Sequence, residues 1–315
     1  MAGLGPLRPR LRRHGAPRLP LPRALVRVAR HVDPREDHPR RLRATRRVLS
    51  STSASRPSDL KGHGFLFQQL VQRELRQKYQ GSVLGLLWYL VNPLLLLGAY
   101  YLMFGVVLKP GFSHPAYPLF IMTAMVVWLF VQQTLPAAGD SLLAQAALLR
   151  KARFPREIIP TAVVTVQALT FAALLAVVAV LTVAFRGTLG FPLLLLPVVV
   201  LLLILFVQGL ALAISGLHAH FRDVQPIVGA ILVPWFFVTP IFYRPTDITD
   251  QSLARFALEW LNPVAPFAEA VRTILYDGNV PSAETLVYLV VVSALALGIG
   301  AALFRRLQRD LAVML

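Results

Sequence analysis

The sequence predicts an all-α, polytopic membrane protein with six transmembrane helices, and three observations lead to this fold class. Apolar residues make up 56% of the 315 residues, and the mean hydropathy of +0.61 is far above that of a soluble domain. The apolar residues come in runs of about 20 or more, the length that a helix needs to cross a bilayer. Basic residues gather in alternate connecting loops, as they do in multi-pass proteins.

Residues 1–60 are expected to form a disordered tail, separate from a membrane domain over residues 61–315. The tail holds 15 arginines and four acidic residues, a net charge of +11, and no sustained apolar stretch that could build a core. Such a tail suits electrostatic binding to anionic membrane lipids. The chain has no aromatic residue before Phe65 on which a base could stack, so nucleic acid is not an expected partner.

The first expected element is an amphipathic interfacial helix over residues 65–80. Glu74 and Lys78 fall inside its apolar stripe, four residues apart in the order that favours an i,i+4 ion pair. The alternative is that both charges reach out to lipid headgroups. The apolar positions that define the stripe are Phe67, Leu70, Val71, Leu75 and Tyr79.

Six apolar segments follow, each long enough to cross about 30 Å of hydrocarbon. The first contains Asn92-Pro93, where the proline predicts a kink. The fifth is short and contains Pro234 and Pro240, so the pattern does not define its ends. The six segments are residues 83–107, 118–138, 158–185, 191–217, 226–243 and 284–304.

The arginine and lysine pattern predicts a multi-pass protein of the inner (cytoplasmic) membrane with both termini in the cytoplasm, because basic loops are retained on that side. The opposite side has Lys109 and Arg186, and a segment over residues 244–283 in which acidic residues outnumber the arginines. The basic residues assigned to the cytoplasmic side are Arg73, Arg76, Lys78, Arg150, Lys151, Arg153, Arg156, Arg222, Arg305, Arg306 and Arg309.

Two cytoplasmic connections are expected to be structured. Residues 141–154 predict a short helix that starts at a cap from Asp140 or Ser141 and stops at Pro155. A helix exposed below the membrane needs a partner to dock on, and the alternative is a simple turn on the membrane surface. The second connection is the loop HAHFRDVQP over residues 218–226, whose two histidines do not face one another on a helix, so no metal pair is expected there.

Residues 244–283 are expected on the side of the membrane opposite the cytoplasm. The apolar pieces Leu253–Leu261 and Ala265–Leu275 are too short to cross, but they are long enough to enter the membrane and return. Aromatic residues are frequent in the first, second and fifth spans. Those near span ends are typical of the interfacial belt, and those at mid-membrane are candidates for lining a path for sugars.

The sequence offers no residues for ATP binding or catalysis. It lacks a glycine-rich phosphate loop, a His-Glu-x-x-His pair, an acidic cluster for magnesium, and cysteine. The interior of the spans carries no acidic residue that could relay protons. We therefore expect no catalytic residue, no cofactor and no metal, and an external source of energy for transport.

Seven segments of the chain occur in a characteristic order. They are RELRQKYQGSVLGLLWYLVNPLL (73–95), YPLFIMTAMVVWLF (117–130), LLRKARFPREIIP (148–160), HFRDVQPIVGAIL (220–232), FFVTPIFY (236–243), LNPVAPFAEAVRTIL (261–275) and FRRLQRDLAVML (304–315). Together they resemble the membrane subunits of type 2 ATP-binding cassette exporters, in the branch that exports O-antigen, capsule, teichoic acid or galactan. The resemblance covers residues 65–315, and Asn92 stands where many members of the family carry glutamine.

The resemblance implies a six-span permease that works as a homodimer with two copies of a separate ATPase subunit and moves a lipid-linked polysaccharide outward. It implies that residues 65–80 form a gate helix, residues 141–154 a coupling helix that docks on the ATPase, and residues 250–280 an outward re-entrant pair. The gate residues are Arg73, Glu74, Arg76, Lys78 and Tyr79; the coupling residues are Leu149, Arg150, Lys151, Arg153, Phe154, Arg156, Arg222 and Asp223; the glycan path has Trp88, Tyr89, Tyr100, Tyr101, Phe104, Trp235, Phe236 and Phe237.

Two alternatives are weighed against this reading. The nearer one is a drug or lipid exporter of the same superfamily. The other is a membrane enzyme of glycolipid assembly that uses its outer loop for catalysis. Its acid or base would have to come from Asp247, Asp250, Glu259 or Glu269, whose spacing suggests no acid/base pair.

Overall fold

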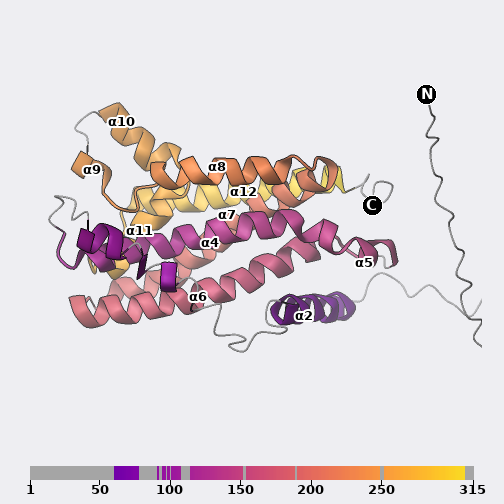
Figure 1. Cartoon of the computed structure of the whole chain (residues 1–315), viewed down its shortest axis with the longest axis horizontal. Helices are drawn as coiled ribbons and strands as arrows, with labels where there is room; N and C mark the ends of the chain where they lie inside the picture. Colours follow the sequence, from indigo (N-terminus) through magenta and orange to yellow (C-terminus); the bar gives the residue numbers. More distant parts are fainter. Residues whose placement is uncertain are drawn as a thin grey trace, which may run out of the picture. The chain divides into compact units, whose positions relative to one another are not determined.

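The computed structural model describes residues 60–77, 91, 94–96, 98–99, 101–107, 114–151, 154–188, 190–248 and 252–308, and every regular element among them is a helix (Figure 1). Four helices are long and apolar enough to cross a membrane. They are α4 (Tyr117–Ala144), α6 (Ile158–Arg186), the 3₁₀ turn η4 (Phe191–Leu195) with α7 (Leu196–His220), and α12 (Ala283–Leu307). They match the second, third, fourth and sixth expected spans.

The first and fifth expected spans are less complete. About half of residues 83–107, including Asn92-Pro93, lies outside the described residues. The described part includes the π-helix η3 (Tyr101–Val107). The fifth span contains α8 (Val224–Val238), whose 15 residues extend over about 22 Å, less than the hydrocarbon core. Six spans therefore remain an expectation, and four are present by length and composition.

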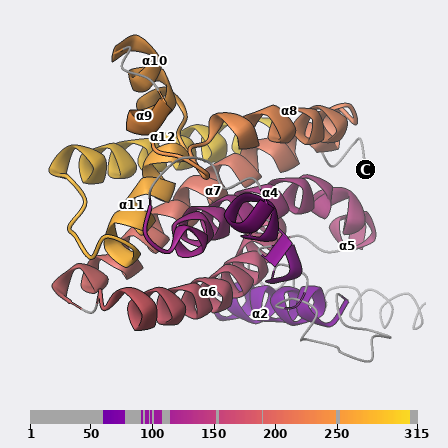
Figure 2. The ribbon, with the colours of Figure 1, turned by 60° about the vertical axis from the view of Figure 1, so that its left-hand side comes forward.

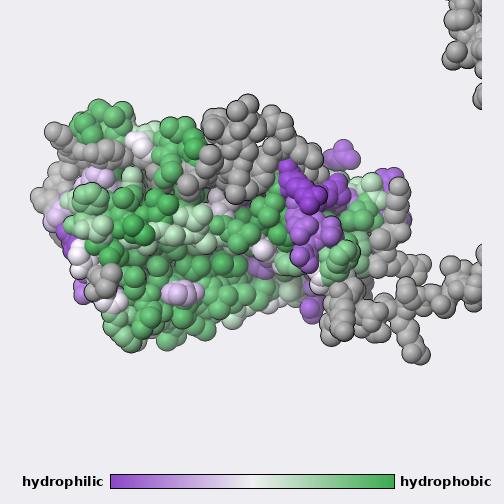
Figure 3. All heavy atoms as spheres, turned by 90° about the horizontal axis from the view of Figure 1, so that it is seen from below, coloured by the Kyte–Doolittle hydropathy of each residue, from purple (hydrophilic) through white to green (hydrophobic). Residues whose placement is uncertain are grey.

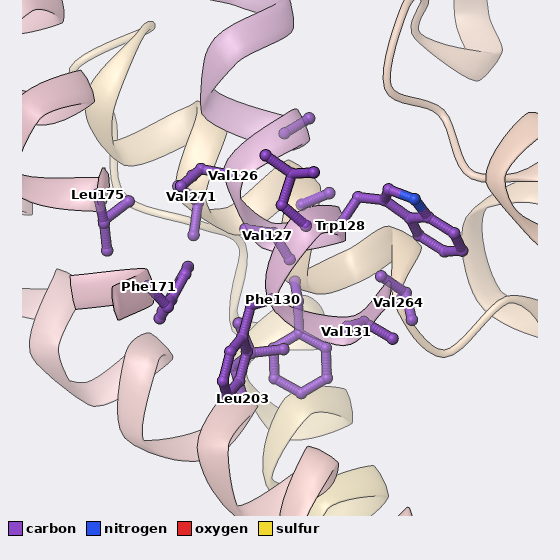
Figure 4. Packing of buried hydrophobic residues seen from close by; sticks show 14 of the residues in the cluster. Val126, Val127, Trp128, Phe130, Val131, Phe171, Leu175, Leu203, Val264 and Val271 are labelled. Carbon is purple, nitrogen blue, oxygen red and sulfur yellow. The ribbon is translucent and has the colours of Figure 1, made fainter. Parts of the chain in front are cut away.

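Helix α4 lies at the centre of the bundle, where it contacts α6, α7, α8 and α11. In its most apolar stretch, 78% of the residues are buried, against 17% in α12. Figure 4 shows Trp128 and Phe130 of α4 among residues of α6, α7 and α11, and the ring of Phe130 stacks on Phe171 at 4.8 Å between centroids. Because lipid is as apolar as these side chains, close packing rather than escape from water favours this arrangement.

Helices α7 and α12 approach backbone to backbone. A Cβ atom at Gly300 would overlap the carbonyl oxygen of Gly209, and one at Gly209 would overlap the backbone of Ala296. The Ser293 hydroxyl donates to the Leu202 carbonyl across the same interface at 2.8 Å. Small residues at the contact and an interhelical hydrogen bond are the features that hold helices together in lipid.

Residues 244–283 form four short helices in a row. They are α9 (Pro245–Ile248), α10 (Ser252–Phe256), the π-helix η5 (Ala257–Leu261) and α11 (Ala265–Leu275). The two expected pieces correspond to α10 with η5 and to α11, and Asn262 separates them as expected. Its Oδ1 accepts from Trp235 Nε1 (2.8 Å) and from the Val264 N–H (3.1 Å), while Nδ2 donates to Thr239 Oγ1 (2.9 Å). One buried amide thus ties this break to the end of α8.

Helix α2 (Leu60–Gln77) overlaps the helix expected over residues 65–80, and its place at the membrane surface stays a prediction. It lies beside α6 in both ribbon views (Figures 1 and 2), and its Leu70 is buried in a second apolar cluster with Leu142 of α4, Ile159 of α6 and Phe304 of α12. The apolar stripe of α2 therefore packs on protein. Figure 3 shows a broad apolar surface, with hydrophilic side chains gathered toward the end that carries α2.

The expected start of the cytoplasmic helix is wrong. Helix α4 continues through Asp140 and Ser141 to Ala144, and the next helix, α5 (Ala146–Lys151), begins after a turn at Gln145. Neither residue caps α5, because the Ser141 hydroxyl donates to the Ala138 carbonyl within α4 (2.6 Å) and Asp140 binds side chains of other helices. Polarity suggested the end of the apolar segment at residue 138, whereas packing keeps the helix intact for six residues more.

Candidate functional site

The bundle has two polar ends. The α5 end comprises α2, α5, the turn between α7 and α8, and the C-terminal part of α12, and the α11 end comprises α9, α10, η5 and α11 with the start of α12 (Figure 1). The expected gate and coupling residues that the structure describes all lie at the α5 end.

The expected gate residues lie on α2 or just beyond it. Arg73 and Arg76 are exposed, and Glu74 is half-buried. Glu74 Oε1 accepts a hydrogen bond from Gln145 Nε2 at 3.4 Å. Lys78 and Tyr79 lie outside the described residues, so the proposed Glu74/Lys78 pair does too. The structure instead shows a contact between α2 and the turn that precedes α5.

The expected coupling residues divide into an apolar group and a charged group. Leu149 and Phe154 pack against the second apolar cluster, below Leu70 and Leu142. Arg150 on α5 is exposed, as are Arg222 and Asp223 in the turn between α7 and α8. The remaining residues are Arg156, whose Nη1 donates to the Gln308 carbonyl at 2.6 Å, Lys151, which is the last residue of α5, and Arg153, which lies outside the described residues.

A polar cluster between α4, α7 and α8 was missed in the sequence. His218 Nε2 lies 3.4 Å from Asp140 Oδ1, and Gln225 Nε2 donates to Asp140 Oδ2 and to the Pro136 carbonyl, both at 3.2 Å. A Cβ atom at Gly139 would lie 2.5 Å from Gln225 Oε1, so a larger residue there would displace the end of this amide side chain. The partners are 78 to 89 positions apart in sequence, and no local pattern links them.

The expected glycan-path aromatics of α8 face different surroundings. Trp235 and Phe236 pack on Trp128 with centroid distances of 6.0 and 5.7 Å, and Phe237 is 63% exposed. Only Phe237 thus presents most of its surface outside the protein. Trp88, Tyr89 and Tyr100 lie outside the described residues, and for Tyr101 and Phe104 the structure describes the π-helix η3 but not the side chains.

The α11 end holds an ion network that the sequence pattern revealed only as an excess of acidic residues. Arg244 lies 3.2 Å from Glu269 through Nε and 2.5 Å from Asp277 through Nη2. Arg272 is fully buried; its Nη1 donates to Glu269 (2.7 Å), and its Nη2 donates to the carbonyls of Pro240 and Ile241 (both 2.9 Å). Its guanidinium carbon also lies 3.9 Å from the centre of the Phe120 ring.

These contacts change the pKa values of ionisable groups at the α11 end. Burial alone lowers the pKa of Arg244, but the carboxylates of Glu269 and Asp277 outweigh it, so its pKa is raised. Burial alone raises the pKa of Asp247, but hydrogen bonds from the Arg244 backbone N–H (2.8 Å) and with His114 (3.0 Å) leave it lowered. Glu259 is paired with Arg255 at 2.8 Å. Each described candidate carboxylate is held by a cation or a histidine, which is unlike a free acid/base pair.

The described residues contain no group of three or more metal-ligating side chains close enough to hold an ion. Among those residues, a basic, partly apolar surface lies at the α5 end, and paired arginines and carboxylates lie at the α11 end.

Comparison with known proteins adds independent findings. A family model described as "ABC-2 type transporter" matches residues 65–276. A protein of Myxococcus xanthus named O-antigen export system permease protein RfbA is 33% identical over 247 residues, which are 78% of this chain and 94% of that protein. A Klebsiella pneumoniae protein of the same name is 28% identical over 263 residues, covering 80% and 96%.

Proposed function

The chain belongs to the ABC-2 type transporter family, and on this premise we propose that it is the permease subunit of an exporter that moves a cell-envelope polysaccharide outward across the inner membrane. Two relatives that cover most of the chain are named as O-antigen export permeases. Two copies of the permease work with two copies of a separate ATPase, and the polysaccharide travels attached to a lipid.

The observation that carries this proposal is the position of α5. It follows α4 after the turn at Gln145. Arg150 is exposed, and its neighbour Leu149 packs against the second apolar cluster. An exposed basic helix anchored to the bundle core is suited to receive a push from a partner. The partner that supplies energy in this family is an ATPase.

Charge distribution supports a cytoplasmic position for the α5 end and both termini. The α11 end has arginines that are matched by Asp247, Glu259, Glu269 and Asp277. The described basic residues at the α5 end are Lys61, Arg73, Arg76, Arg150, Lys151, Arg156, Arg222, Arg305 and Arg306.

Coupling follows a short chain of contacts. Movement of α5 is transmitted through the second apolar cluster to Leu70 of α2 and through Gln145 to Glu74. Helix α2 lies where the first expected span begins, so its displacement opens or closes the cytoplasmic entrance. In the homodimer that we propose, α8, whose Ile227, Ile231 and Phe237 are exposed, borders the path.

The proposal is tested by reversing charge on the docking surface. Arg150→Glu combined with Arg222→Glu is expected to abolish stimulation of the partner ATPase and export in vesicles, while the chain still inserts in the membrane. Arg306→Glu is the matched control, because this exposed arginine lies at the same end on α12. Unchanged ATPase stimulation and export in the double variant would refute the docking role.

The alternatives predict different substrates. A drug or lipid exporter would be stimulated by hydrophobic small molecules or phospholipids, whereas we expect stimulation by a lipid-linked oligosaccharide. A glycolipid enzyme would turn over without the ATPase and would need a free carboxylate. The pairing of Asp247, Glu259 and Glu269 in the structure argues against that function.

A further inference from the structure

The α11 end contains a cavity of about 270 Å³ beneath η5. It opens between α9, η5, the start of α11 and the start of α12. Charged and aromatic residues line it together with hydroxyl groups, and three prolines complete the wall. The lining residues that matter here are Arg244, Arg255, Glu259, Trp260, Glu269 and Thr285.

The charges in this lining cancel. Arg255 pairs with Glu259 at 2.8 Å, and Arg244 pairs with Glu269 at 3.2 Å. Each guanidinium has more N–H donors than these contacts use, and the second oxygen of Glu259 is left to accept. The cavity therefore offers many hydrogen bonds and no net charge among its lining side chains, which favours an uncharged ligand rich in hydroxyl groups over an anion or a cation.

Trp260 supplies a rigid apolar wall beside these polar groups. Its ring meets Tyr288 of α12 edge-on at 5.2 Å, and the Tyr288 hydroxyl donates to the Trp260 carbonyl at 2.6 Å. Ser282 caps α12 by accepting from the Thr285 N–H at 3.2 Å, which places both hydroxyls at the cavity. Trp260 lies in a π-helix, a geometry that recurs at functional sites.

We propose that this cavity binds an uncharged sugar unit at the outer end of the transport path. A sugar ring has one apolar face of C–H groups and a rim of hydroxyls, which match the indole and the paired side chains. The volume lies just below the roughly 300 Å³ at which pockets for drug-sized ligands begin, so one or two sugar rings fit. The inference rests on the proposed function, because the sugar belongs to the exported polysaccharide.

A sugar site at this end has a role that the α5 end lacks. Weak binding after passage retains the leading part of the chain outside while the cytoplasmic entrance resets. The Arg255–Glu259 pair is 49% and 30% exposed, so a sugar reaches it without unfolding the ion network below. Arg272, which is fully buried next to this network, bonds Glu269 and so helps to fix the cavity wall.

The test measures binding without transport. The permease–ATPase complex is purified in a sugar-free amphipol, since maltoside detergents would compete, and saturation-transfer NMR is recorded with methyl glycosides of neutral hexoses. Methyl glucuronoside serves as the anionic probe and glycerophosphocholine as the zwitterionic one. Trp260→Ala and Glu259→Gln are expected to weaken neutral glycosides about fivefold to tenfold. Leu253→Ala, an exposed neighbour on α10 outside the lining, is the matched control.

If Trp260→Ala fails to fold, sugar binding can still be tested with Glu259→Gln, because the Glu259 side chain is partly exposed. Neutral glycosides that bind equally well to both variants would overturn the assignment to this cavity. Binding of glycerophosphocholine without neutral glycosides would overturn it in favour of a lipid headgroup. A wild-type complex that exports polysaccharide but binds no glycoside refutes the cavity alone, whereas one that hydrolyses ATP and exports none refutes the proposed function.

Discussion

The two ends of the bundle hold their polar groups in opposite ways. At the α11 end, Arg244, Glu269, Arg272 and Asp277 form one connected network. At the α5 end, Glu74–Gln145 and His218–Asp140 are separate contacts of 3.4 Å. Among the described residues, buried polar atoms without a hydrogen-bond partner occur at both ends. They are Gln145 Oε1, His218 Nδ1, His220 Nε2 and Gln225 Oε1 at the α5 end, and Arg244 Nε and Arg272 Nε at the α11 end, where other nitrogens of each guanidinium are bonded.

This difference indicates which end moves. Shifting α11 would separate several charge-assisted bonds at once and expose a buried guanidinium, which is costly. Shifting α2 or α5 breaks single weak bonds, and unused acceptors and donors are ready to form others. We infer that the α11 end is the fixed frame and the α5 end the responsive one.

Breaking the ion network at the α11 end is expected to have the largest effect on stability. Arg272→Met leaves Glu269 and the carbonyls of Pro240 and Ile241 without their buried donor, at a cost of about 3–5 kcal/mol. Thermal unfolding of the purified complex should shift strongly downward. Arg255→Gln removes an exposed cation from the same end and should shift it little. Equal unfolding temperatures for the two variants would mean that the network is not a frame.

The link between the ends is tested in the α7–α12 pair, which runs the length of the bundle. Gly300→Ala places a Cβ against the Gly209 carbonyl, and the overlap should cost about 1–3 kcal/mol. Gly298→Ala makes the same change two positions earlier, where the structure has open space. A lower unfolding temperature is expected for the first variant only, and its absence would show that the helices separate easily.

The responsive end should lose function rather than stability. Glu74→Ala or Gln145→Ala removes one hydrogen bond between an amide and a carboxylate. The free energy of unfolding should therefore fall by about 1 kcal/mol. Export per ATP hydrolysed is expected to fall severalfold in each single variant and no further in the double variant, because both act through one contact. Gln69→Ala, an exposed change on the same helix, is the control. Additive losses would contradict a shared contact.

The smallest effect concerns Asp247 and pH. Its folded-state pKa is lowered by hydrogen bonds that outweigh burial, so its stabilising contribution is present above the unfolded pKa of about 3.9 and is lost as pH falls through the lower folded pKa. Asp247→Asn should remove this part of the acid sensitivity, worth under about 1 kcal/mol because the site is solvated. Unfolding temperatures between about pH 3 and pH 6 report it, and parallel curves for both proteins would exclude the contribution.

Sequence and structure agree where local chemistry decides. The spans over residues 118–138, 158–185, 191–217 and 284–304 correspond to helices because long apolar runs have few alternatives in a membrane protein. The break at Asn262-Pro263 was also predictable, since proline and a side chain that bonds its own backbone favour interruption. The amphipathic stripe of α2 identified a helix, although not the protein surface on which it packs.

Periodicity and the seven segments in order were therefore sufficient for the helical class and the family, because both depend on residues close together in the chain. The tertiary structure alone decided that α4, the least hydrophobic of the four long helices, is the most buried. A helix facing protein tolerates polar groups that lipid excludes. It alone decided that Arg272 is fully buried, that Gly300 meets Gly209, and that Glu74 meets Gln145. Apart from the i,i+3 pair of Arg272 with Glu269, these contacts join residues 31 to 91 positions apart, which no local pattern encodes.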